Sequence, residues 1–426
     1  MKNITIGLFG FGCVGQGLYQ TLNQSKNFAG QIAKIGIKNP DKKRDLPADL
    51  FTTDARSIIE DTKIDIIVEL IDDAQAAFDI VVASLKAGKS VVTANKKMVA
   101  ENMQYLVDLQ KETGRAVLYE GAVCGSIPII RTLEEYFGHE PLTEVKGVFN
   151  GSTNYILSRV FHDKLNYSAA LEQAQALGFA ESNPALDVEG FDAKYKLCIL
   201  ISHTFGLHIH PDEILNLGIQ RIKPADLEYA SARGLRIKLL GHAQCVDDKI
   251  YAFVMPRFVS LDDNLATVEN EYNAVVINGE FCDNQWFTGK GAGSLPTGAA
   301  VLSDVSALSY DYKYEYKKES HKEHLVFANN SPVKVYTSFG SPEDVVLDDF
   351  DQIYEKYFSY DHCYVVGTVC LNKLNTKEWK NNPHINVVLS SDKLDNTLGK
   401  LCVNDLKDEI GELKKSQKLR KKLMLQ

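Results

Sequence analysis

Apolar, strand-like runs alternate with helical segments over the first 120 residues of this chain. The runs cover residues 4–9, 32–37, 64–71, 90–93 and 116–120. Helical patterns at residues 78–87 and 102–113 separate later runs, and each is followed by a glycine. Parallel strands need a crossover between them, usually a helix, whereas antiparallel neighbours need only a turn. The alternation therefore predicts an α/β fold with helices on both faces of a parallel sheet.

A glycine pattern follows the first of these strands. Gly10, Gly12 and Gly15 form G-x-G-x-x-G between strand 4–9 and a helix. Glycines here let the backbone approach a pyrophosphate, which rests on the helix N-terminus. In this β-α-β context the pattern is typical of dinucleotide binding, so we expect a Rossmann-type doubly wound sheet. The expected cofactor contacts in this turn are Gly10, Gly12, Cys13, Val14 and Gly15.

The end of the second strand bears on the choice of cofactor. NAD-binding units usually carry Asp or Glu there, for the ribose 2′-hydroxyl. This chain has no acid at that point and instead carries four cations within seven residues, namely Lys38, Lys42, Lys43 and Arg44. Such charge suits a 2′-phosphate, so NADP(H) is favoured over NAD(H). Two alternatives stay open: Asp41 could face the ribose, or the lysines could be solvated surface.

The stretch from residue 177 to residue 196 concentrates charged side chains. Its carboxylates are Glu181, Asp187, Glu189 and Asp192, and Lys196 follows the last by four residues. The apolar spacing after Gly190 predicts a helix, which would place Asp192 and Lys196 on one face. The cluster suits an ammonium-bearing substrate beside a lysine that donates a proton or stabilises an alkoxide. Capping carboxylates and a surface ion pair would give the same pattern.

The remainder of the chain predicts two further regions. Between residues 131 and 290 a strand at 146–149, an apolar run at 235–243 and strand-like runs at 250–255, 273–277 and 285–289 indicate an α+β domain. A glycine-rich loop at 289–297 then opens a helix, which suggests that the chain returns to the cofactor cleft. Residues 310–318 look like a linker, and a coarse β-α-β-β-α pattern runs from residue 333 into a basic last helix.

We therefore expect three domains. A dinucleotide-binding domain covers 1–130 and is completed by 291–310, a catalytic and dimerisation domain covers 131–290, and a small α+β region covers 311–426. A net charge of −9 argues against non-specific nucleic-acid binding. No apolar run reaches the roughly 20 residues of a membrane helix, and the N-terminus reads as a strand, not a signal peptide. Eight cysteines without C-x-x-C spacing are typical of reduced thiols, so we expect a cytoplasmic protein.

Five segments occur in an order that is particular to one family. They are Gly10–Gly15, Thr93-Ala-Asn-Lys-Lys97, Glu120-Gly-Ala-Val-Cys-Gly-Ser-Ile-Pro128, Asn150-Gly-Ser-Thr-Asn-Tyr-Ile-Leu157 with the 177–196 block, and Gly289-x-Gly-Ala-Gly293. Together they closely resemble homoserine dehydrogenase, the enzyme that interconverts aspartate 4-semialdehyde and L-homoserine with a nicotinamide cofactor. The resemblance spans residues 4 to about 308. It implies an NAD(P)-dependent oxidoreductase of threonine and methionine biosynthesis with a small-molecule substrate.

The resemblance also implies residue roles. Lys196 matches the lysine taken as proton donor to the carbonyl oxygen. Glu181 and Asp192, with Asp187 nearby, match carboxylates that hold the substrate. Lys96 matches a lysine that contacts the cofactor or the site. Because ligands bind at the carboxyl ends of parallel strands, the position of Lys96 after strand 90–93 independently agrees.

The remaining implied contacts involve backbone. Gly293 matches a glycine near the cofactor. The family binds a monovalent cation, Na+ or K+, through the carbonyl oxygens of positions that match Glu120, Val123, Gly125 and Ile127. Members of the family also associate as homodimers through the catalytic domain, whose strands need their exposed face covered. We therefore expect a homodimer.

The chain departs from the family pattern in three places. Asp72 and Asp73 stand where many relatives carry two glycines, near the expected nicotinamide, and Cys124 stands at a position often filled by glycine. The region 311–426 occupies the place of the regulatory, amino-acid-binding ACT domain of longer relatives. It lacks an Asp-x-x-Gly-x-Leu loop, which argues against feedback inhibition by threonine.

Two other hypotheses compete with the reductase. An acylating semialdehyde dehydrogenase would use Cys124 as its nucleophile, which requires an activated thiolate and a nearby base. No histidine lies within fourteen residues of Cys124 on either side. A non-enzymatic redox sensor on a dinucleotide fold predicts erosion of the catalytic cluster, yet Glu181, Asp192 and Lys196 are all present.

Overall fold

The computed structural model describes residues 3–341, 343–345, 347–359 and 362–390. The chain forms two compact units, each assembled from separate stretches. Unit 1 combines Met1–Gly151, Asp192–Glu213 and Glu271–Leu325, and unit 2 combines Ser152–Phe191, Ile214–Asn270 and Val326–Gln426. The three domain ranges expected from the sequence stay a prediction. Within the described residues no helix is long and apolar enough to cross a membrane.

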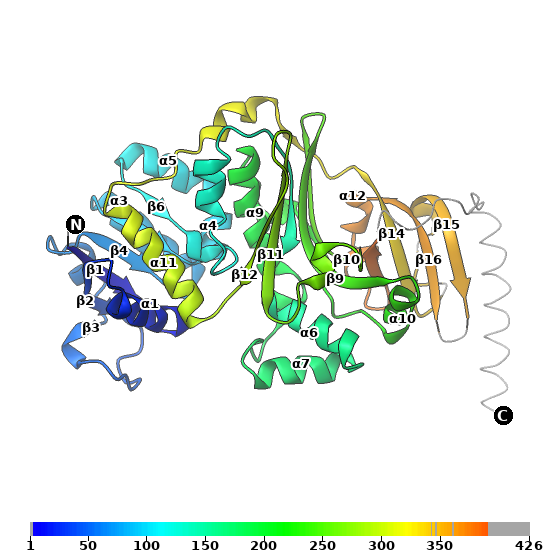
Figure 1. Ribbon diagram of the computed structural model, residues 1–426, viewed down its shortest axis with the longest axis horizontal. Helices are drawn as coiled ribbons and strands as arrows, with labels where there is room; N and C mark the ends of the chain where they lie inside the picture. Colours follow the sequence, from blue (N-terminus) through cyan, green and yellow to red (C-terminus); the bar gives the residue numbers. More distant parts are fainter. Residues whose placement is uncertain (1–2, 342, 346, 360–361, 391–426) are drawn as a thin grey trace. The chain divides into compact units, whose positions relative to one another are not determined.

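Unit 1 contains a six-stranded parallel sheet, ordered β3-β2-β1-β4-β5-β6 (Figure 1). Its strands are β1 (Ile4–Phe9), β2 (Gly30–Gly36), β3 (Phe51–Thr52), β4 (Ile66–Glu69), β5 (Ser90–Thr93) and β6 (Val117–Leu118). The helices α3 (Ala74–Lys86), α4 (Lys96–Glu101) and α5 (Met103–Thr113) connect successive strands. Strands β4, β5 and β6 are almost wholly buried, as expected of a sheet covered on both faces. The predicted Rossmann-type sheet is confirmed.

The first helix of this sheet packs against a helix from much later in the chain. Figure 1 shows α11 (Ser294–Leu308) beside α1 (Cys13–Gln24). A Cβ atom at Gly17 would lie 1.9 Å from the carbonyl oxygen of Ser294, so the approach requires glycine. Ser294 Oγ also donates to the carbonyl oxygen of Cys13 at 2.8 Å. The late glycine-rich loop thus brings the chain back to the fingerprint turn.

The rest of unit 1 consists of three antiparallel strands and a buried helix. β11 (Tyr272–Gly279) pairs with both β7 (Leu142–Val148) and β12 (Asp283–Lys290). Helix α9 (Phe191–Phe205) is buried from Asp192 to its end. A helix that is buried on every side is a core element, so the polar groups it carries need partners inside the protein.

The tyrosine-rich stretch after α11, which the sequence predicted to be a linker, lies within unit 1 and packs into it. Tyr314 and Tyr316 are buried, and both rings pack against His203 of α9. The hydroxyl of Tyr119 lies 2.9 Å from His203 Nε2 and 2.8 Å from the hydroxyl of Tyr316. These tyrosines therefore belong to the core of unit 1.

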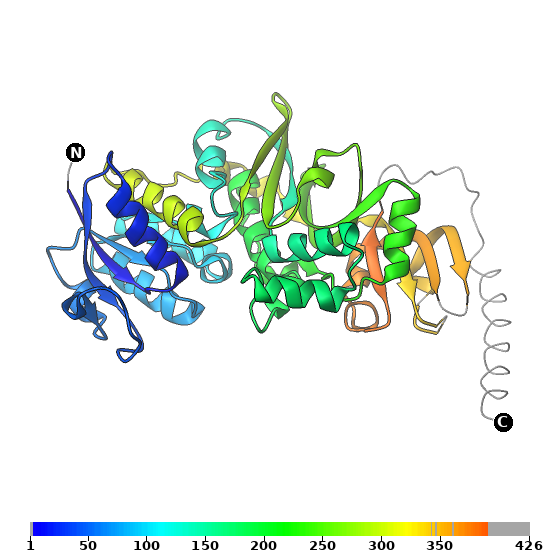
Figure 2. The ribbon, with the colours of Figure 1, turned by 60° about the horizontal axis from the view of Figure 1, so that its bottom comes forward.

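Unit 2 begins with helices and continues into a long hairpin. Figure 2 shows α6 (Gly151–His162) and α7 (Tyr167–Ala176) running next to each other. They are followed by α8 (Ala185–Val188), β8 (Leu215–Asn216) and α10 (Pro224–Ala232). The apolar run at 235–243 is part of β9 (Leu235–Val246), which pairs along its whole length with β10 (Lys249–Ser260).

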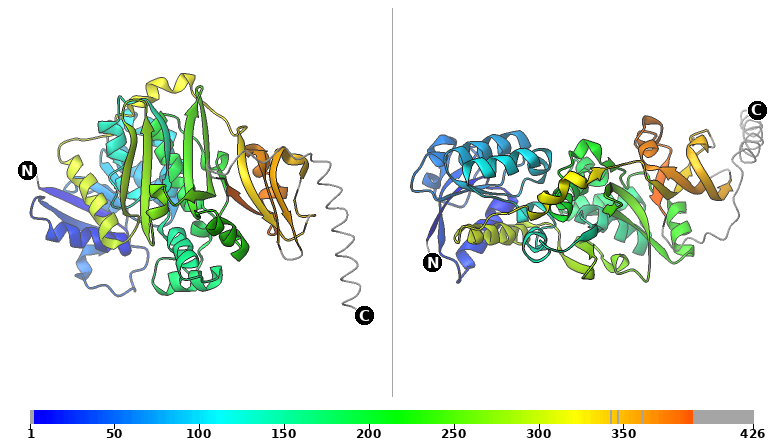
Figure 3. Two further views of the ribbon diagram at one scale, coloured as in Figure 1. Left: turned by 45° about the vertical axis from the view of Figure 1, so that its right-hand side comes forward. Right: turned by 90° about the horizontal axis from the view of Figure 1, so that it is seen from above.

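The C-terminal part of unit 2 contains three consecutive strands, seen as orange arrows in Figure 3. They are β14 (Pro332–Phe339), β15 (Phe350–Phe358) and β16 (Cys363–Cys370), followed by α12 (Leu371–Leu374), α13 (Lys377–Lys380) and β17 (Asn386–Leu389). The predicted order β-α-β-β-α is wrong, because the described residues between β14 and β15 form a short 3-10 turn (Leu347–Asp349). The predicted last helix lies outside the described residues.

Candidate active site

Asp192 and Lys196 form an ion pair at the start of α9. Lys196 Nζ lies 2.7 Å from Asp192 Oδ2, and Lys96 Nζ lies 2.8 Å from Asp192 Oδ1. The side chains of Asp192 and Lys196 are 5% and 8% exposed, whereas that of Lys96 is 41% exposed. Lys96 is the first residue of α4, which the Asn95 side chain caps by accepting from the backbone N–H of Met98. The structure therefore brings Lys96 to the Asp192–Lys196 pair that the sequence predicted.

Two amides and a backbone carbonyl hold this pair. Asn150 Nδ2 donates to Asp192 Oδ2 at 2.9 Å, and Lys196 Nζ donates to the carbonyl oxygen of Phe149 at 2.7 Å. Asn273 Nδ2 donates to the same carbonyl oxygen at 2.9 Å. Sequence reasoning missed all three partners. A polar residue such as Asn273 at the start of an otherwise apolar strand was the one available signal.

The charges of the site explain the ionisation of Asp192. Burial opposes its charged form, but Lys196, Lys96 and Asn150 outweigh burial and hold the pKa of Asp192 well below its usual range. The side chain of Asp192 therefore favours its ionised form. An anion placed between two lysines fixes where their ammonium groups lie.

Cys124 lies close to this cluster, but it is an unreactive thiol. It is fully buried, and burial raises its pKa to about 11 although Lys196 lowers it. A catalytic cysteine needs a depressed pKa and a neighbouring base. The geometry thus opposes the acylating alternative.

A second buried carboxyl, Glu69, ends β4. Its two oxygens accept from the backbone N–H of Ile71 and from the hydroxyl of Thr93, each at 2.6 Å. Burial raises its pKa to about 7, despite those hydrogen bonds. Sequence reasoning missed Glu69. Of the two unusual acids that follow, Asp73 caps α3 by accepting from the backbone N–H of Ala76 at 3.0 Å.

The fingerprint turn has the shape expected for a phosphate site. Gly10 adopts a φ of +91°, and a Cβ atom there would lie 2.5 Å from the carbonyl oxygen of Leu70. A Cβ atom at Gly15 would lie 2.4 Å from the carbonyl oxygen of Gly10. Gly12 has open space around it and precedes α1 without any side-chain cap, so Cys13 and Val14 open the helix. The first N–H groups of α1 are therefore available to an anion.

A pocket of about 590 Å³ lies beside the second strand. Lys42, Lys43 and Arg44 line it together with Phe51. Arg44 lies over the Phe51 ring at 5.2 Å and donates to the carbonyl oxygens of Lys42 and Asn39. Lys38 is exposed and is not among the residues that line this pocket.

The loop expected to bind a cation begins at the buried Glu120, which contacts the buried Asp304 of α11. The backbone N–H of Glu120 donates to Asp304 Oδ2 at 2.8 Å, and the Glu120 carboxylate accepts from the N–H groups of Ile130 and Arg131. Asp304 Oδ1 has no hydrogen-bond partner among the described residues. Burial raises the pKa of both acids, and the charge of Glu120 raises that of Asp304 further. Oxygen donors and an unsatisfied buried carboxylate suit a hard cation.

The other predicted carbonyl donors, Val123, Gly125 and Ile127, follow Glu120 in the sequence. The carbonyl oxygens of Glu120 and Ile127 already accept from the N–H groups of Val123 and Ile129. A carbonyl oxygen has two lone pairs, so these bonds leave room for a second partner. Gly125 adopts a φ of +54°, and a Cβ atom there would lie 2.6 Å from the carbonyl oxygen of Lys290.

Of the expected substrate carboxylates, Asp192 belongs to unit 1, and Glu181 and Asp187 belong to unit 2. Glu181 is exposed, and its backbone carbonyl accepts from Gln175 Nε2 at 2.8 Å. Asp187 lies in α8 and is half-buried. Gly293, by contrast, lies in unit 1, where it precedes α11 with a φ of +123°.

Known proteins resemble this chain over most of its length. A family model described as "Homoserine dehydrogenase, NAD binding domain" matches residues 10–120, and one described as "Homoserine dehydrogenase" matches residues 128–306. A homoserine dehydrogenase of Bacillus subtilis is 36% identical over 367 residues, which are 84% of this chain and 82% of the relative. The chain belongs to the homoserine dehydrogenase family. It is an NAD(P)-dependent oxidoreductase that interconverts aspartate 4-semialdehyde and L-homoserine.

Other homoserine dehydrogenases extend the comparison. One from Helicobacter pylori is 37% identical over 311 residues, which are 71% of this chain and 73% of the relative. The crystal structure of a homoserine dehydrogenase from Thiobacillus denitrificans superposes with a TM-score of 0.81 at 28% identity, covering 92% of this chain and 99% of that one. A hyperthermophilic archaeal homoserine dehydrogenase mutant in complex with NADPH gives a TM-score of 0.63 at 26% identity, covering 74% of this chain and 100% of that one.

Proposed function

We propose that Lys196 is the cation and proton source of the homoserine dehydrogenase reaction. A bound nicotinamide supplies the hydride in the direction of aldehyde reduction. Negative charge then builds on the carbonyl oxygen of the substrate, and a cation must already lie there to stabilise it. Lys196 fits this role because its ammonium is buried and fixed between Asp192 and the Phe149 carbonyl oxygen. Proton transfer from Nζ to the alkoxide completes the hydroxyl of homoserine.

The neighbouring residues have supporting roles in this proposal. Asp192 orients both lysines, and Lys96, which is more exposed, acts on the side of the cofactor. Glu181 binds the substrate ammonium, and Asp187 supports it. The single observation that carries the assignment is the carboxylate of Asp192 between two lysine ammonium groups at 2.7 and 2.8 Å.

The test replaces Lys196 in the purified full chain and measures homoserine oxidation and semialdehyde reduction. Lys196→Ala should lower kcat by about 10²–10⁴ and leave the affinity for NADPH nearly unchanged. Asp192→Ala should be similarly severe, whereas Glu181→Ala should mainly raise the KM of the amino-acid substrate. Near-normal turnover in Lys196→Ala would overturn the assignment and point to Lys96.

We infer that NADP(H) is preferred over NAD(H). Support comes from the three cations that line the pocket beside β2, and from Arg44, whose guanidinium lies over the ring of Phe51, which also lines that pocket. A 2′-phosphate offers bidentate and charge-assisted hydrogen bonds to such groups. Steady-state kinetics with both cofactors on the purified chain test this preference directly.

We also propose a monovalent cation, Na+ or K+, held by the carbonyl oxygens of Glu120, Val123, Gly125 and Ile127. The unsatisfied Asp304 Oδ1 and the two buried acids support it, because a nearby positive charge would allow them to ionise. The cation would stiffen the loop that follows Tyr119. A homodimer and a cytoplasmic location complete the proposal, the latter supported by the free thiols of all seven cysteines in the described residues.

A further inference from the structure

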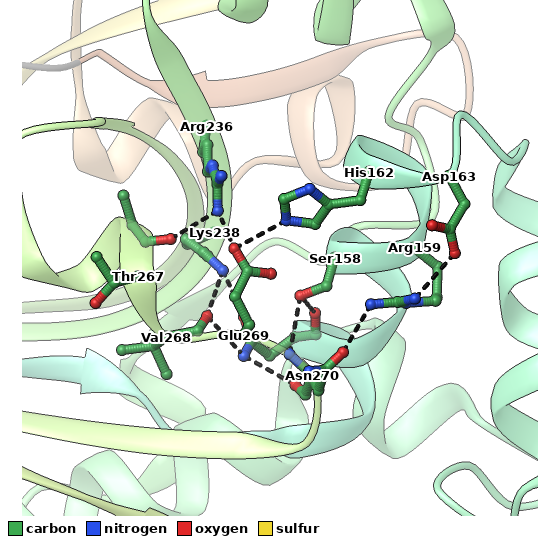
Figure 4. Close-up of polar contacts among 12 residues, drawn as sticks. Ser158, Arg159, His162, Asp163, Arg236, Lys238, Thr267, Val268, Glu269 and Asn270 are labelled. Carbon is green, nitrogen blue, oxygen red and sulfur yellow. Dashed lines mark hydrogen bonds and ion pairs between the residues drawn. The ribbon is translucent and has the colours of Figure 1, made fainter.

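A buried lysine in unit 2 binds only neutral acceptors among its hydrogen-bond partners. Lys238 on β9 is 2% exposed. Its Nζ donates to Asn154 Oδ1 at 3.0 Å. It also donates to the carbonyl oxygen of Val268 at 2.5 Å (Figure 4). Burial, and then the charge of Arg236, lower its pKa to about 7. An apolar side chain of this size at such a position would make the fold more stable. The lysine therefore indicates a role in holding the geometry of its partners.

The charged groups around Lys238 are engaged with one another. Glu269 forms ion pairs with Arg236 of β9 and with His162 of α6, and Arg159 of α6 bonds both Asp163 and Asn270 (Figure 4). Burial lowers the pKa of His162, and the charge of Arg236 lowers it further. Lys238 therefore stabilises the two segments that contain its hydrogen-bond acceptors, residues 149–154 and 268–273.

The first segment leads to Asp192. Asn154 lies in the first turns of α6, and its Nδ2 donates to the carbonyl oxygens of Val268 and Asn270 at 3.0 and 2.9 Å. An amide can turn over and exchange its donor and acceptor ends; a donor on Oδ1 fixes which way it points. Lys238 is that donor. Asn150, one turn earlier, is the residue whose amide holds Asp192.

The second segment leads to Lys196. The carbonyl oxygen of Val268 accepts from Lys238, and Asn273, five residues later, donates to the carbonyl oxygen of Phe149. The same carbonyl accepts from Lys196. A Cβ atom at Gly151 would lie 2.7 Å from the carbonyl oxygen of Glu271, so the two segments are tightly packed where they meet.

We propose that Lys238 is a positioning residue of the homoserine dehydrogenase reaction, fixing through Asn154 and Val268 the two segments that hold Asp192 and Lys196. The inference rests on the proposed roles of that pair. Lys238 touches neither of them and acts only on the backbone and amide groups that hold them. Misplacing a reacting group by 1 Å can lower a rate by about 10²-fold, so a lysine outside the site is able to control turnover.

The experiment compares Lys238→Met with Leu240→Ala in the full chain. Leu240 lies on the same strand, two residues along, and is equally buried, so its truncation loosens the strand but removes no hydrogen bond to Asn154 or Val268. Lys238→Met should lower kcat by about 10- to 100-fold while the KM for NADPH stays within about twofold. With NADPH deuterated at the transferred position, the isotope effect on kcat should rise, because the chemical step becomes slower.

A double-mutant cycle separates positioning from stability. If Lys238 acts through Asn154, Asn154→Leu should lower kcat similarly, and the double variant should be no slower than either single one. Equal activity of Lys238→Met and Leu240→Ala at equal melting temperature would overturn the proposal. Should Lys238→Met fail to fold, Asn154→Leu takes its place and must show the same fall in kcat at a nearly unchanged KM for NADPH. Near-normal turnover in Lys196→Ala would instead contradict the proposed function itself.

Discussion

The carboxyl of Glu69 binds its proton more tightly in the folded chain than in the unfolded chain. Its folded pKa is about 7 and its ordinary value 4.5, so between these pH values the folded chain keeps a proton that the unfolded chain has lost. Stability therefore falls as pH rises through this window and is level above it. Relative to Glu69→Gln, the unaltered chain should be less stable at pH 7.5 than at pH 4.5.

Urea unfolding of both proteins at the two pH values measures this difference. Glu60→Gln is the matched control, since Glu60 is exposed and precedes β4. The control should show no such dependence on pH. If Glu69→Gln and the unaltered chain differ by the same amount at both pH values, the carboxyl of Glu69 is ionised in the folded protein.

Cys124 provides a second test at this scale. Because burial raises its pKa to about 11, no thiolate forms near neutral pH, and Cys124→Ser should keep turnover within a few-fold of the unaltered chain. Rates of semialdehyde reduction measure it. Complete loss of activity in a folded Cys124→Ser variant would revive the acylating mechanism.

The residues of the site divide by how far their partners lie in the sequence. The Asp192–Lys196 pair is four residues apart on a helix, and Lys96 follows a parallel strand, so local rules are enough to expect both. Asn150, Asn273 and Glu69 acquire their roles from contacts made across the fold. No local pattern contains such contacts, and sequence reasoning missed all three.

Among the elements, the packing of α1 against α11 depends on the absence of a side chain at one position, Gly17. Alanine at Gly17 would place its Cβ 1.9 Å from the backbone oxygen of Ser294, and backbone cannot move aside as a side chain can. Gly17→Ala should therefore destabilise the chain by about 1–3 kcal/mol, more than the gain in helix propensity returns. Thermal unfolding measures it. Gln20→Ala, at an exposed position of the same helix, should leave the melting temperature unchanged or raise it.

The basic loop after β2 is the element that bears on cofactor choice. Each charge-assisted contact with a 2′-phosphate contributes roughly 1.5–3 kcal/mol. Arg44→Ala and Lys38→Glu should each raise the KM for NADPH and leave that for NADH nearly unchanged. Arg44 should have the larger effect, because it lines the pocket and Lys38 does not. Equal responses of the two Michaelis constants would identify the loop as solvated surface.

At the scale of elements the sequence predicted the parallel sheet well and the C-terminal region poorly. The sheet has long apolar runs, crossover helices and a fingerprint that agree with one another. In the C-terminal region the runs are short, and a short apolar run does not distinguish strand from helix by periodicity. The prediction therefore placed a helix among the strands β14, β15 and β16.

At the scale of the whole molecule, the C-terminal strands and the earlier part of unit 2 pack into one apolar core. Leu215, Phe253 and Met255 pack in the same cluster as Trp379 and Phe350. A chain that ends at residue 325 should leave the first three exposed and form aggregates. Light scattering and binding of an apolar dye measure this. A monodisperse truncated chain that binds no dye would contradict the shared core.

The proposed homodimer is also tested on the whole molecule. Sedimentation of the full chain at micromolar concentration should give twice the mass of 47.4 kDa. A single species at the monomer mass would rule out the dimer. Neither outcome depends on the assignment of Lys196.

The interleaving of the two units has a consequence for synthesis. Lys196 is made early, but the amide that steadies its carbonyl partner is Asn273, and the helix that closes against the fingerprint turn begins at Ser294. At about 5–20 residues per second, a ribosome needs roughly 15–60 seconds to reach that helix. Until then the nascent chain carries every catalytic side chain without the contacts that align them. The nascent enzyme is thus inactive until this helix has been synthesised. Its dinucleotide fold is completed only by residues made after the catalytic ones.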